Sequence, residues 1–443
     1  MSTDRFLVHE HRIPGQHVRE YPAATAHKQE DVLYLEIKQY SPRSNASPSP
    51  GDVTIIGAHA NGFPKELYEP LWDELLARAE TNGFKIRDIW IADVAHQGYS
   101  GVVNENVLGN DPSWHDHARD LLHMINHFRD QMPRPLMGIG HSMGAASLAT
   151  LSLMHPRLLT SLILLDPVIF EIEHIPARPD FAIMSTFRRD RWPSRPEAEA
   201  SFRKSPVYKR WDKRVLDRWI QHGLRELPTA IYPDAGPGLS SSSSSTQGIT
   251  LRTALPQELH SYSRLKVLPT DSQGLAIVDR DRFPDLPSGK LVKAADFYRP
   301  EPVWISANLP HIRPSVLWIF GAESPISPPI TQDDKMARTG TGVGGSGGAG
   351  EGRVSKVVVA RAGHLVAMEA VAACAEASAG WIGAEMRRWR AQEEQFKVAW
   401  TDRPHREKIT VSEEWKVRMG GDPRARAKNG KKAAEKGGAK SNL

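Results

Sequence analysis

One fifteen-residue stretch, PLMGIGHSMGAASLA from Pro135 to Ala149, constrains the fold more than any other part of the chain. Its apolar start ends at Gly140-His141-Ser142-Met143-Gly144, and small apolar residues continue without a break. This G-x-S-x-G pattern is typical of a strand that turns directly into a helix. The tight turn strains the backbone of its central residue, and the flanking glycines leave room for it. We therefore expect the Ser142 hydroxyl to project at a helix N-terminus, where free N–H groups favour a developing negative charge.

Strand-like and helix-like segments alternate on both sides of this turn. The alternation predicts an α/β protein with a mostly parallel sheet that is flanked by helices. The strand-like segments are 53–58, 86–94, 159–165, 315–320 and 356–360, and helical patterns cover 67–79, 113–131 and 366–389.

The alternation stops between residues 171 and 310, where Pro-rich links and the Ser240–Ser245 run interrupt short helical segments. We interpret 171–310 as an inserted helical cap with a low-complexity loop. Residues 1–170 and 311–390 then form the two parts of one core, the second with a Gly-rich loop at 340–352. Residues 391–443 are predicted to be a polar to basic tail, partly disordered.

The net charge of +5 is concentrated at the C-terminal end of the chain. From Pro423 to Leu443 there are seven Lys or Arg against one Glu, so the remaining residues sum to −1. A neutral body of this kind argues against nucleic-acid binding. The single cysteine, Cys374, excludes an intrachain disulfide. We expect neither a secretory signal nor a transmembrane segment, because no apolar run is long enough.

Ser142 requires a base, and in a protein of this order the base follows the last strand. His364, in the loop after 356–360, meets that requirement. His96 and His141 lie near strand ends and could shape the site. We predict Ser142 as nucleophile and His364 as general base.

A carboxylate must orient the base, and two positions at strand ends qualify. Asp166 follows the 159–165 strand, and Glu323 follows the 315–320 strand. Position after a strand alone does not decide which of these two carboxylates is the acid. The oxyanion hole is assigned to the main-chain amides of Met143, directly after the nucleophile, and Asn61, in the loop HANGFP. The sequence contains no metal-ligand set, so we predict neither a metal nor a cofactor.

The motifs HANGFPKELYEPLWD, DVAHQGYS, GHSMG, LLDP and AGHLVAMEA occur in this order between Val53 and Trp389. In these motifs the chain resembles α/β-hydrolase-fold serine hydrolases, in particular the fungal peroxisomal lipase and AK-toxin biosynthesis group. The resemblance implies an eight-stranded sheet with a cap and esterase- or lipase-like chemistry. Many relatives have Asp in a G-x-x-D-P motif, where this chain has Ser324. That departure favours Asp166 over Glu323 as the acid.

Together these features predict a serine hydrolase that cleaves a carboxylic ester, or a thioester or lactone, of a small-molecule substrate. Acyl transfer or a biosynthetic reaction on the same residues is the first alternative, and a non-catalytic binding protein on this fold is the second. The final residues Ser441-Asn442-Leu443 resemble the S-K-L peroxisomal signal. We therefore predict a peroxisomal location through an import receptor, with the cytoplasm as the alternative.

Overall fold

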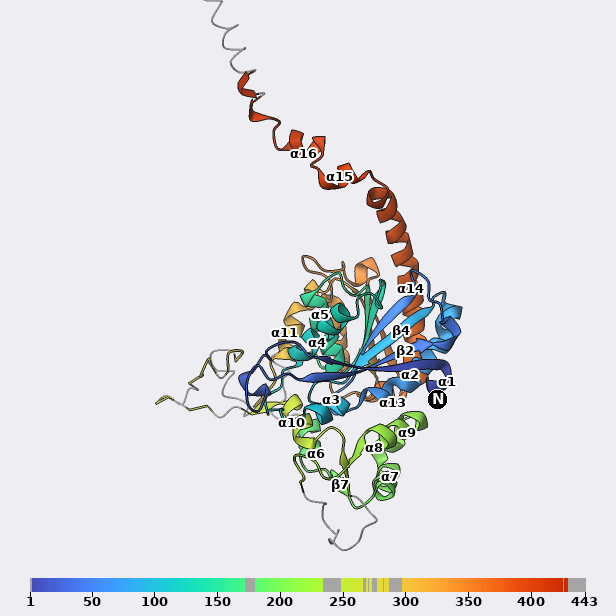
Figure 1. Ribbon diagram of the computed structural model, residues 1–443, viewed down its shortest axis with the longest axis vertical. Helices are drawn as coiled ribbons and strands as arrows, with labels where there is room; N and C mark the ends of the chain where they lie inside the picture. The colour runs from blue at the N-terminus through green and yellow to red at the C-terminus, as the bar shows by residue number, and fades with distance from the viewer. Residues whose placement is uncertain are drawn as a thin grey trace, which may run out of the picture. The chain divides into compact units, whose positions relative to one another are not determined.

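An eight-stranded sheet forms the centre of the structure, a computed structural model (Figure 1). The model describes residues 2–171, 180–233, 248–265, 268–269, 271–272, 277–281, 283–286, 297–424 and 426–428. The chain divides into two units, Met1–Met386 and Arg387–Leu443. The sheet and everything that surrounds the candidate site belong to the first unit.

The strands are ordered β1-β2-β4-β3-β5-β6-β12-β13 across the sheet. All neighbours from β4 to β13 are parallel, while β1 and β2 are antiparallel to each other and β2 is antiparallel to β4. The mostly parallel eight-stranded sheet predicted from the sequence is confirmed. The strands are β1 (Phe6–Pro14), β2 (Tyr34–Pro42), β3 (Val53–Ala58), β4 (Ile86–Ala92), β5 (Leu136–His141), β6 (Ser161–Leu165), β12 (Ser315–Gly321) and β13 (Val354–Val359).

The central strands are buried along their whole length because helices cover both faces of the sheet. Every residue of β3, β5, β6 and β12 is buried, as expected for parallel strands packed on two sides. The helices that alternate with the strands are α2 (Glu69–Ala79), α3 (Gly98–Asn104), α4 (Trp114–His127), α5 (Met143–Met154), α11 (Glu301–Asn308), α12 (Pro329–Arg338), α13 (Val366–Glu369) and α14 (Val371–Phe396).

Helix α5, which follows the G-x-S-x-G turn, is buried from Met143 to Ser152. It packs against β5 and between α4 and α11 (Figure 1). A helix surrounded in this way has no polar face, which explains why small and apolar residues continue without interruption after Ser142.

The segment between β6 and α11 forms short helices and two small sheets, β7-β9-β8 and β10-β11. Figure 1 shows α6 to α9 below one end of the main sheet. Ser240–Ser245 lies outside the described residues. The elements are α6 (Asp180–Thr186), β7 (Arg191–Trp192), α7 (Arg195–Lys204), α8 (Pro206–Lys209), α9 (Lys213–His222), β8 (Leu224–Glu226), β9 (Ile249–Leu251), α10 (Leu255–Tyr262), β10 (Arg264–Leu265) and β11 (Phe297–Tyr298).

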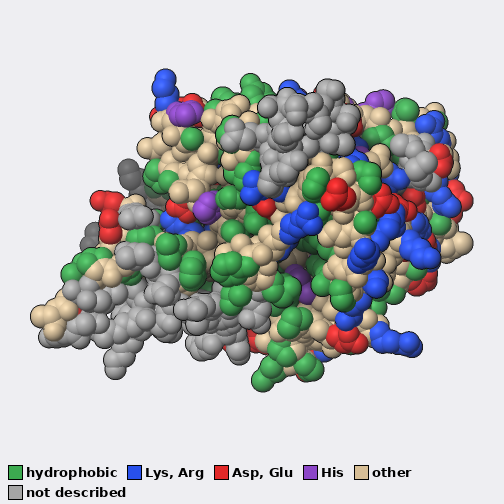
Figure 2. All heavy atoms as spheres, turned by 90° about the horizontal axis from the view of Figure 1, so that it is seen from below, with side chains coloured by type: hydrophobic (Ala, Val, Ile, Leu, Met, Phe, Trp, Pro, Cys, Tyr) green, Lys and Arg blue, Asp and Glu red, His purple; other side chains and the backbone are tan. Residues whose placement is uncertain are grey.

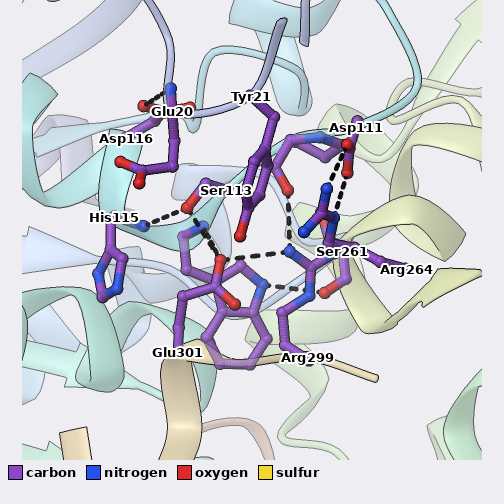
Figure 3. Close-up of polar contacts among 12 residues, drawn as sticks. Glu20, Tyr21, Asp111, Ser113, His115, Asp116, Ser261, Arg264, Arg299 and Glu301 are labelled. Carbon is purple, nitrogen blue, oxygen red and sulfur yellow. Dashed lines mark hydrogen bonds and ion pairs between the residues drawn. The ribbon is translucent and has the colours of Figure 1, made fainter. Parts of the chain in front are cut away.

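A buried polar network fixes the cap where its chain returns to the core (Figure 3). Arg264 binds both carboxylate oxygens of Asp111, at 2.6 and 2.7 Å. Arg299 pairs with Glu301 at 3.2 Å, and Glu301 accepts hydrogen bonds from the Ser113 hydroxyl and the Trp114 amide. Both arginines are almost fully buried. Breaking such a pair would leave a buried charge without a partner, so the network holds the cap in one position.

The second unit, Arg387–Leu443, contains α15 (His405–Ile409) and α16 (Glu413–Arg418). Within the described ranges, no helix has the length and apolar character that crossing a membrane requires. The division of the chain into core, cap and tail remains a prediction.

Candidate active site

Ser142 lies at the turn between β5 and α5 with backbone angles of φ 55° and ψ −116°. These angles are rare for a residue with a side chain, and strain of this kind persists only where the surroundings enforce it. The Ser142 amide donates to the Leu165 carbonyl of β6 at 2.9 Å, which helps to fix the turn.

The two glycines of the motif are required by close backbone contacts. A Cβ atom on Gly140 would lie 2.8 Å from the backbone of Ala145. One on Gly144 would lie 2.3 Å from the Ala58 carbonyl oxygen at the end of β3. The first turn of α5 therefore lies directly against the loop that follows β3, which carries Asn61.

Ser142, His364 and Asp166 form a continuous chain of hydrogen bonds. The Oγ of Ser142 lies 2.9 Å from Nε2 of His364, and Nδ1 of His364 lies 2.6 Å from Oδ2 of Asp166. Because a carboxylate only accepts, Nδ1 carries the proton and Nε2 is free to accept the serine proton. Asp166 is completely buried, whereas the His364 side chain is about 10% exposed.

Of the two carboxylates left open by the sequence, only Asp166 contacts His364. Glu323 is half exposed and pairs with Arg210 of the cap at 2.8 Å. Ser324, at the position where many relatives have Asp, donates its hydroxyl to Oδ2 of Asp166 at 2.5 Å. The loop after β12 thus holds the carboxylate that the strand β6 supplies.

His141 joins the loop after β3 to the loop that carries His364. Its Nε2 lies 3.0 Å from the His364 carbonyl, and its Nδ1 lies 2.9 Å from the Tyr68 hydroxyl. Since the carbonyl only accepts, Nε2 donates and Nδ1 accepts from Tyr68, whose oxygen also receives the Ala60 amide at 2.8 Å. Burial and the neighbouring His364 lower the pKa of His141 to about 3. The ring is therefore neutral near pH 7 and acts as a fixed spacer.

The main-chain amides of Asn61 and Met143 make no hydrogen bond within the described part of the chain. Met143 is the first residue of α5, so its amide has no partner inside the helix. Asn61 follows β3, and its loop lies against that first turn. Both amides are therefore available to an oxygen atom bound beside Ser142.

Gln97, which sequence reasoning missed, fixes the Asn61 loop through its side-chain amide. Its Nε2 donates to Oδ1 of Asn61 at 2.6 Å, and its Oε1 accepts from the Gly62 amide at 2.8 Å. Helix α10 of the cap adds two further contacts: Asn61 Nδ2 donates to the Glu258 carbonyl, and Ser261 Oγ accepts from Gln97. The motif HQGYS was the only sequence feature that pointed to Gln97.

His96 also contacts Ser261, at 2.6 Å. It therefore supports the cap and makes no contact with Ser142 or His364.

This arrangement contains a hydroxyl, a base, an orienting carboxylate and two free amides, which together are the parts required for acyl transfer to a serine. Among the described residues, no group of three His, Cys, Asp or Glu side chains is placed to hold a metal ion.

Comparisons with known proteins bear on the family of this chain. The model of the Alpha/beta hydrolase family matches residues 55–377. A type I acyl-CoA thioesterase of Penicillium brevicompactum, mpaH', is 43% identical over 426 residues, which are 94% of this chain and 95% of that protein. The abhydrolase domain-containing protein AFT2-1 of Alternaria alternata is 31% identical over 252 residues, 57% of this chain and 84% of that protein.

Among solved structures, the peroxisomal alpha-beta-hydrolase Lpx1 of Saccharomyces cerevisiae is similar, with a TM-score of 0.63. The alignment covers 99% of both chains at 17% sequence identity. At this identity the similarity concerns the fold alone.

Substitutions of Asp166 and Glu323 should show which carboxylate orients His364. Asp166→Asn keeps the size of the side chain but no longer favours the Nδ1–H tautomer, so kcat for a chromogenic acyl ester should fall by about 10⁴. Glu323→Gln breaks only an exposed ion pair and should change kcat by less than about twofold. Equal losses in the two variants, with both proteins folded by circular dichroism, would contradict this assignment.

Proposed function

Because the chain is a hydrolase that belongs to the alpha/beta hydrolase family, we propose that it cleaves acyl thioesters of coenzyme A through an acyl-enzyme on Ser142. The hydrogen-bonded chain from Ser142 through His364 to Asp166 carries this proposal. The thioester as substrate class rests on the similarity to the protein named acyl-CoA thioesterase, which extends over almost the whole of both chains.

In the first step, His364 removes the proton from the Ser142 hydroxyl as Oγ attacks the thioester carbonyl. The carbonyl oxygen becomes an oxyanion, and the amides of Asn61 and Met143 stabilise it by donating hydrogen bonds. Collapse of this intermediate breaks the carbon–sulfur bond, and the proton held on Nε2 of His364 passes to the departing thiol. Asp166 stabilises the imidazolium through Nδ1 and does not itself take the proton.

In the second step, water replaces the thiol. His364 takes a proton from the water as the water oxygen attacks the acyl carbon. The same two amides stabilise the oxyanion that forms. The carbon–Ser142 bond breaks, the proton returns to Oγ, and the carboxylic acid leaves. The sum is one thioester and one water converted to one acid and one thiol. An oxyester follows the same steps, with an alcohol as the leaving group.

Ser142→Ala tests the proposal directly. With an acyl-CoA panel of different chain lengths, the wild type should release free thiol, detected with a disulfide reagent. The kcat of the variant should fall at least about 10⁴-fold, because no acyl-enzyme forms. Ser147→Ala is a matched control, since that buried hydroxyl of the same helix donates to the Met143 carbonyl and makes no other hydrogen bond with a described residue. Full activity in the Ser142 variant would overturn the proposal. Products formed with an added alcohol in place of water would favour acyl transfer.

We also propose that the C-terminal residues Ser441, Asn442 and Leu443 direct the protein to peroxisomes through an import receptor. These residues lie outside the described part of the chain, so the proposal rests on their similarity to the S-K-L signal and on the basic residues before them.

A fluorescent fusion that leaves the C-terminus free should appear as puncta that coincide with a peroxisomal marker in a fungal cell. Deletion of residues 441–443 should disperse the signal through the cytoplasm, whereas Leu443→Lys tests the terminal side chain alone. Puncta that persist after the deletion would show that these residues are not the signal.

A further inference from the structure

The cap segment from Arg188 to Glu226 is strongly basic, although the body of the protein is close to neutral. It contains twelve Lys or Arg residues and six Asp or Glu residues, a net charge of +6. On the face drawn in Figure 2, Lys and Arg side chains gather on one side of the molecule. Charge that is concentrated in this way attracts an anionic ligand and raises its local concentration.

The arginines of this segment are largely neutralised by carboxylates, whereas three lysines are not. Arg203 pairs with Asp217 at 2.9 Å, and Arg214 pairs with Asp212 at 2.8 Å. The lysines are exposed and form no ion pair with any residue that the structure describes. We call them the cap lysines: Lys204, Lys209 and Lys213.

Aromatic packing holds the three cap lysines on one part of the cap. Phe202 of α7 contacts Tyr208 of α8, with ring centroids 5.0 Å apart, and Tyr208 contacts Trp211 at 4.8 Å. Trp211 contacts Trp219 of α9 at 6.3 Å. The cap lysines stand at the ends of these three helices, at the last residues of α7 and α8 and the first residue of α9.

The junction between α8 and α9 lies against both loops of the candidate site. Trp211 packs edge-to-face on Phe63, two residues after Asn61, with ring centroids 5.5 Å apart. Arg210 donates to the Arg361 carbonyl at 3.1 Å, and the Asp212 amide donates to the Met368 carbonyl at 2.8 Å. These contacts place Lys209 and Lys213, which flank the junction, beside the segment that carries His364.

Helix stability does not account for Lys213. It is the first residue of α9, where the helix dipole disfavours a cation. Arg214, next to it, has Asp212 and Glu74 as partners, but Lys213 has none among the described residues. Within the described residues, Lys213 is therefore an exposed cation without a carboxylate partner and is available to an external anion.

We propose that the cap lysines bind the phosphate groups of coenzyme A, which places the thioester carbonyl of the bound acyl-CoA at Ser142. This inference rests on the proposed function and names the part of the substrate that the cap recognises. Coenzyme A carries its phosphates at the adenosine end, remote from the thioester, so they need a site outside the reaction centre. Flexible ammonium groups suit phosphates that must be bound and then released with the product.

Kinetics with two thioesters test the cap lysines. The variant K204Q/K209Q/K213Q should raise KM for an acyl-CoA about tenfold, because exposed charge contacts are individually weak and act together, and kcat should not change. KM for the same acyl group on N-acetylcysteamine, which has no phosphate, should be unaffected. The control K28Q/K85Q/K397Q removes three exposed lysines outside the cap and should leave both KM values unchanged. An unchanged KM for acyl-CoA, or an equal rise for both thioesters, would overturn the proposal.

Binding of free coenzyme A, measured by calorimetry, separates this inference from the proposed function. The wild type should bind coenzyme A, and the cap variant should bind it about tenfold more weakly. If the wild type hydrolyses neither thioester but shows this difference in binding, the proposed function fails and the phosphate site stands. If the wild type and the cap variant bind coenzyme A equally, or neither binds it, the phosphate site is wrong whatever the activity.

Discussion

The hydrogen bond between Nδ1 of His364 and Oδ2 of Asp166 is the contact on which the candidate site depends. It joins residues 198 positions apart in the sequence. The bond can form because β6, β12 and β13 are neighbours in the sheet and end at the same edge. The Asp166 amide is tied to the Ile319 carbonyl of β12, and Ser324 of the following loop donates to the same carboxylate oxygen. Sheet order therefore fixes the tautomer of His364 and leaves its Nε2 facing the Ser142 hydroxyl.

The Asn61 loop and the cap are connected more closely than the sequence indicated. Gln97 links Asn61 and Gly62 to Ser261 of α10, while Phe63 packs into the aromatic cluster of α8 and α9. Elements of the cap thus contact the same loop that carries the Asn61 amide. Buried ion pairs also fix the cap at the point where its chain returns to the core (Figure 3). A cap that moved freely would move the Asn61 loop with it.

The fold and the family were predictable because their signals are local. Alternating apolar segments predicted the parallel sheet, and the G-x-S-x-G turn predicted the strand-to-helix junction at Ser142; the structure and the family comparison confirm both the fold and the family. Strand position alone left Asp166 and Glu323 open, since both follow a strand, and only the resemblance, through Ser324 at the usual acid position, favoured Asp166. Which of them meets His364 depends on how the chain beyond each strand turns.

The supporting residues were missed for a related reason. Tyr68 and Gln97 are ordinary polar residues whose importance comes only from their partners in space. His96 and His141 were both expected near the site, but one contacts the cap and the other contacts the His364 carbonyl. The cap lysines carry no motif at all. Only their surroundings distinguish them: carboxylates pair with most arginines of the cap, whereas these three lysines have no ion pair within the described part of the chain.

The proposed mechanism requires Ser142 to carry the acyl group during turnover. Rapid acid quenching of the enzyme with an excess of a slowly hydrolysed acyl-CoA, followed by digestion and mass spectrometry, tests it most directly. The peptide containing Ser142 should gain the mass of the acyl group, the modification should map to Ser142, and it should disappear as the substrate is exhausted. Release of free coenzyme A at the normal rate, with no acyl group on Ser142 at any time, would contradict it.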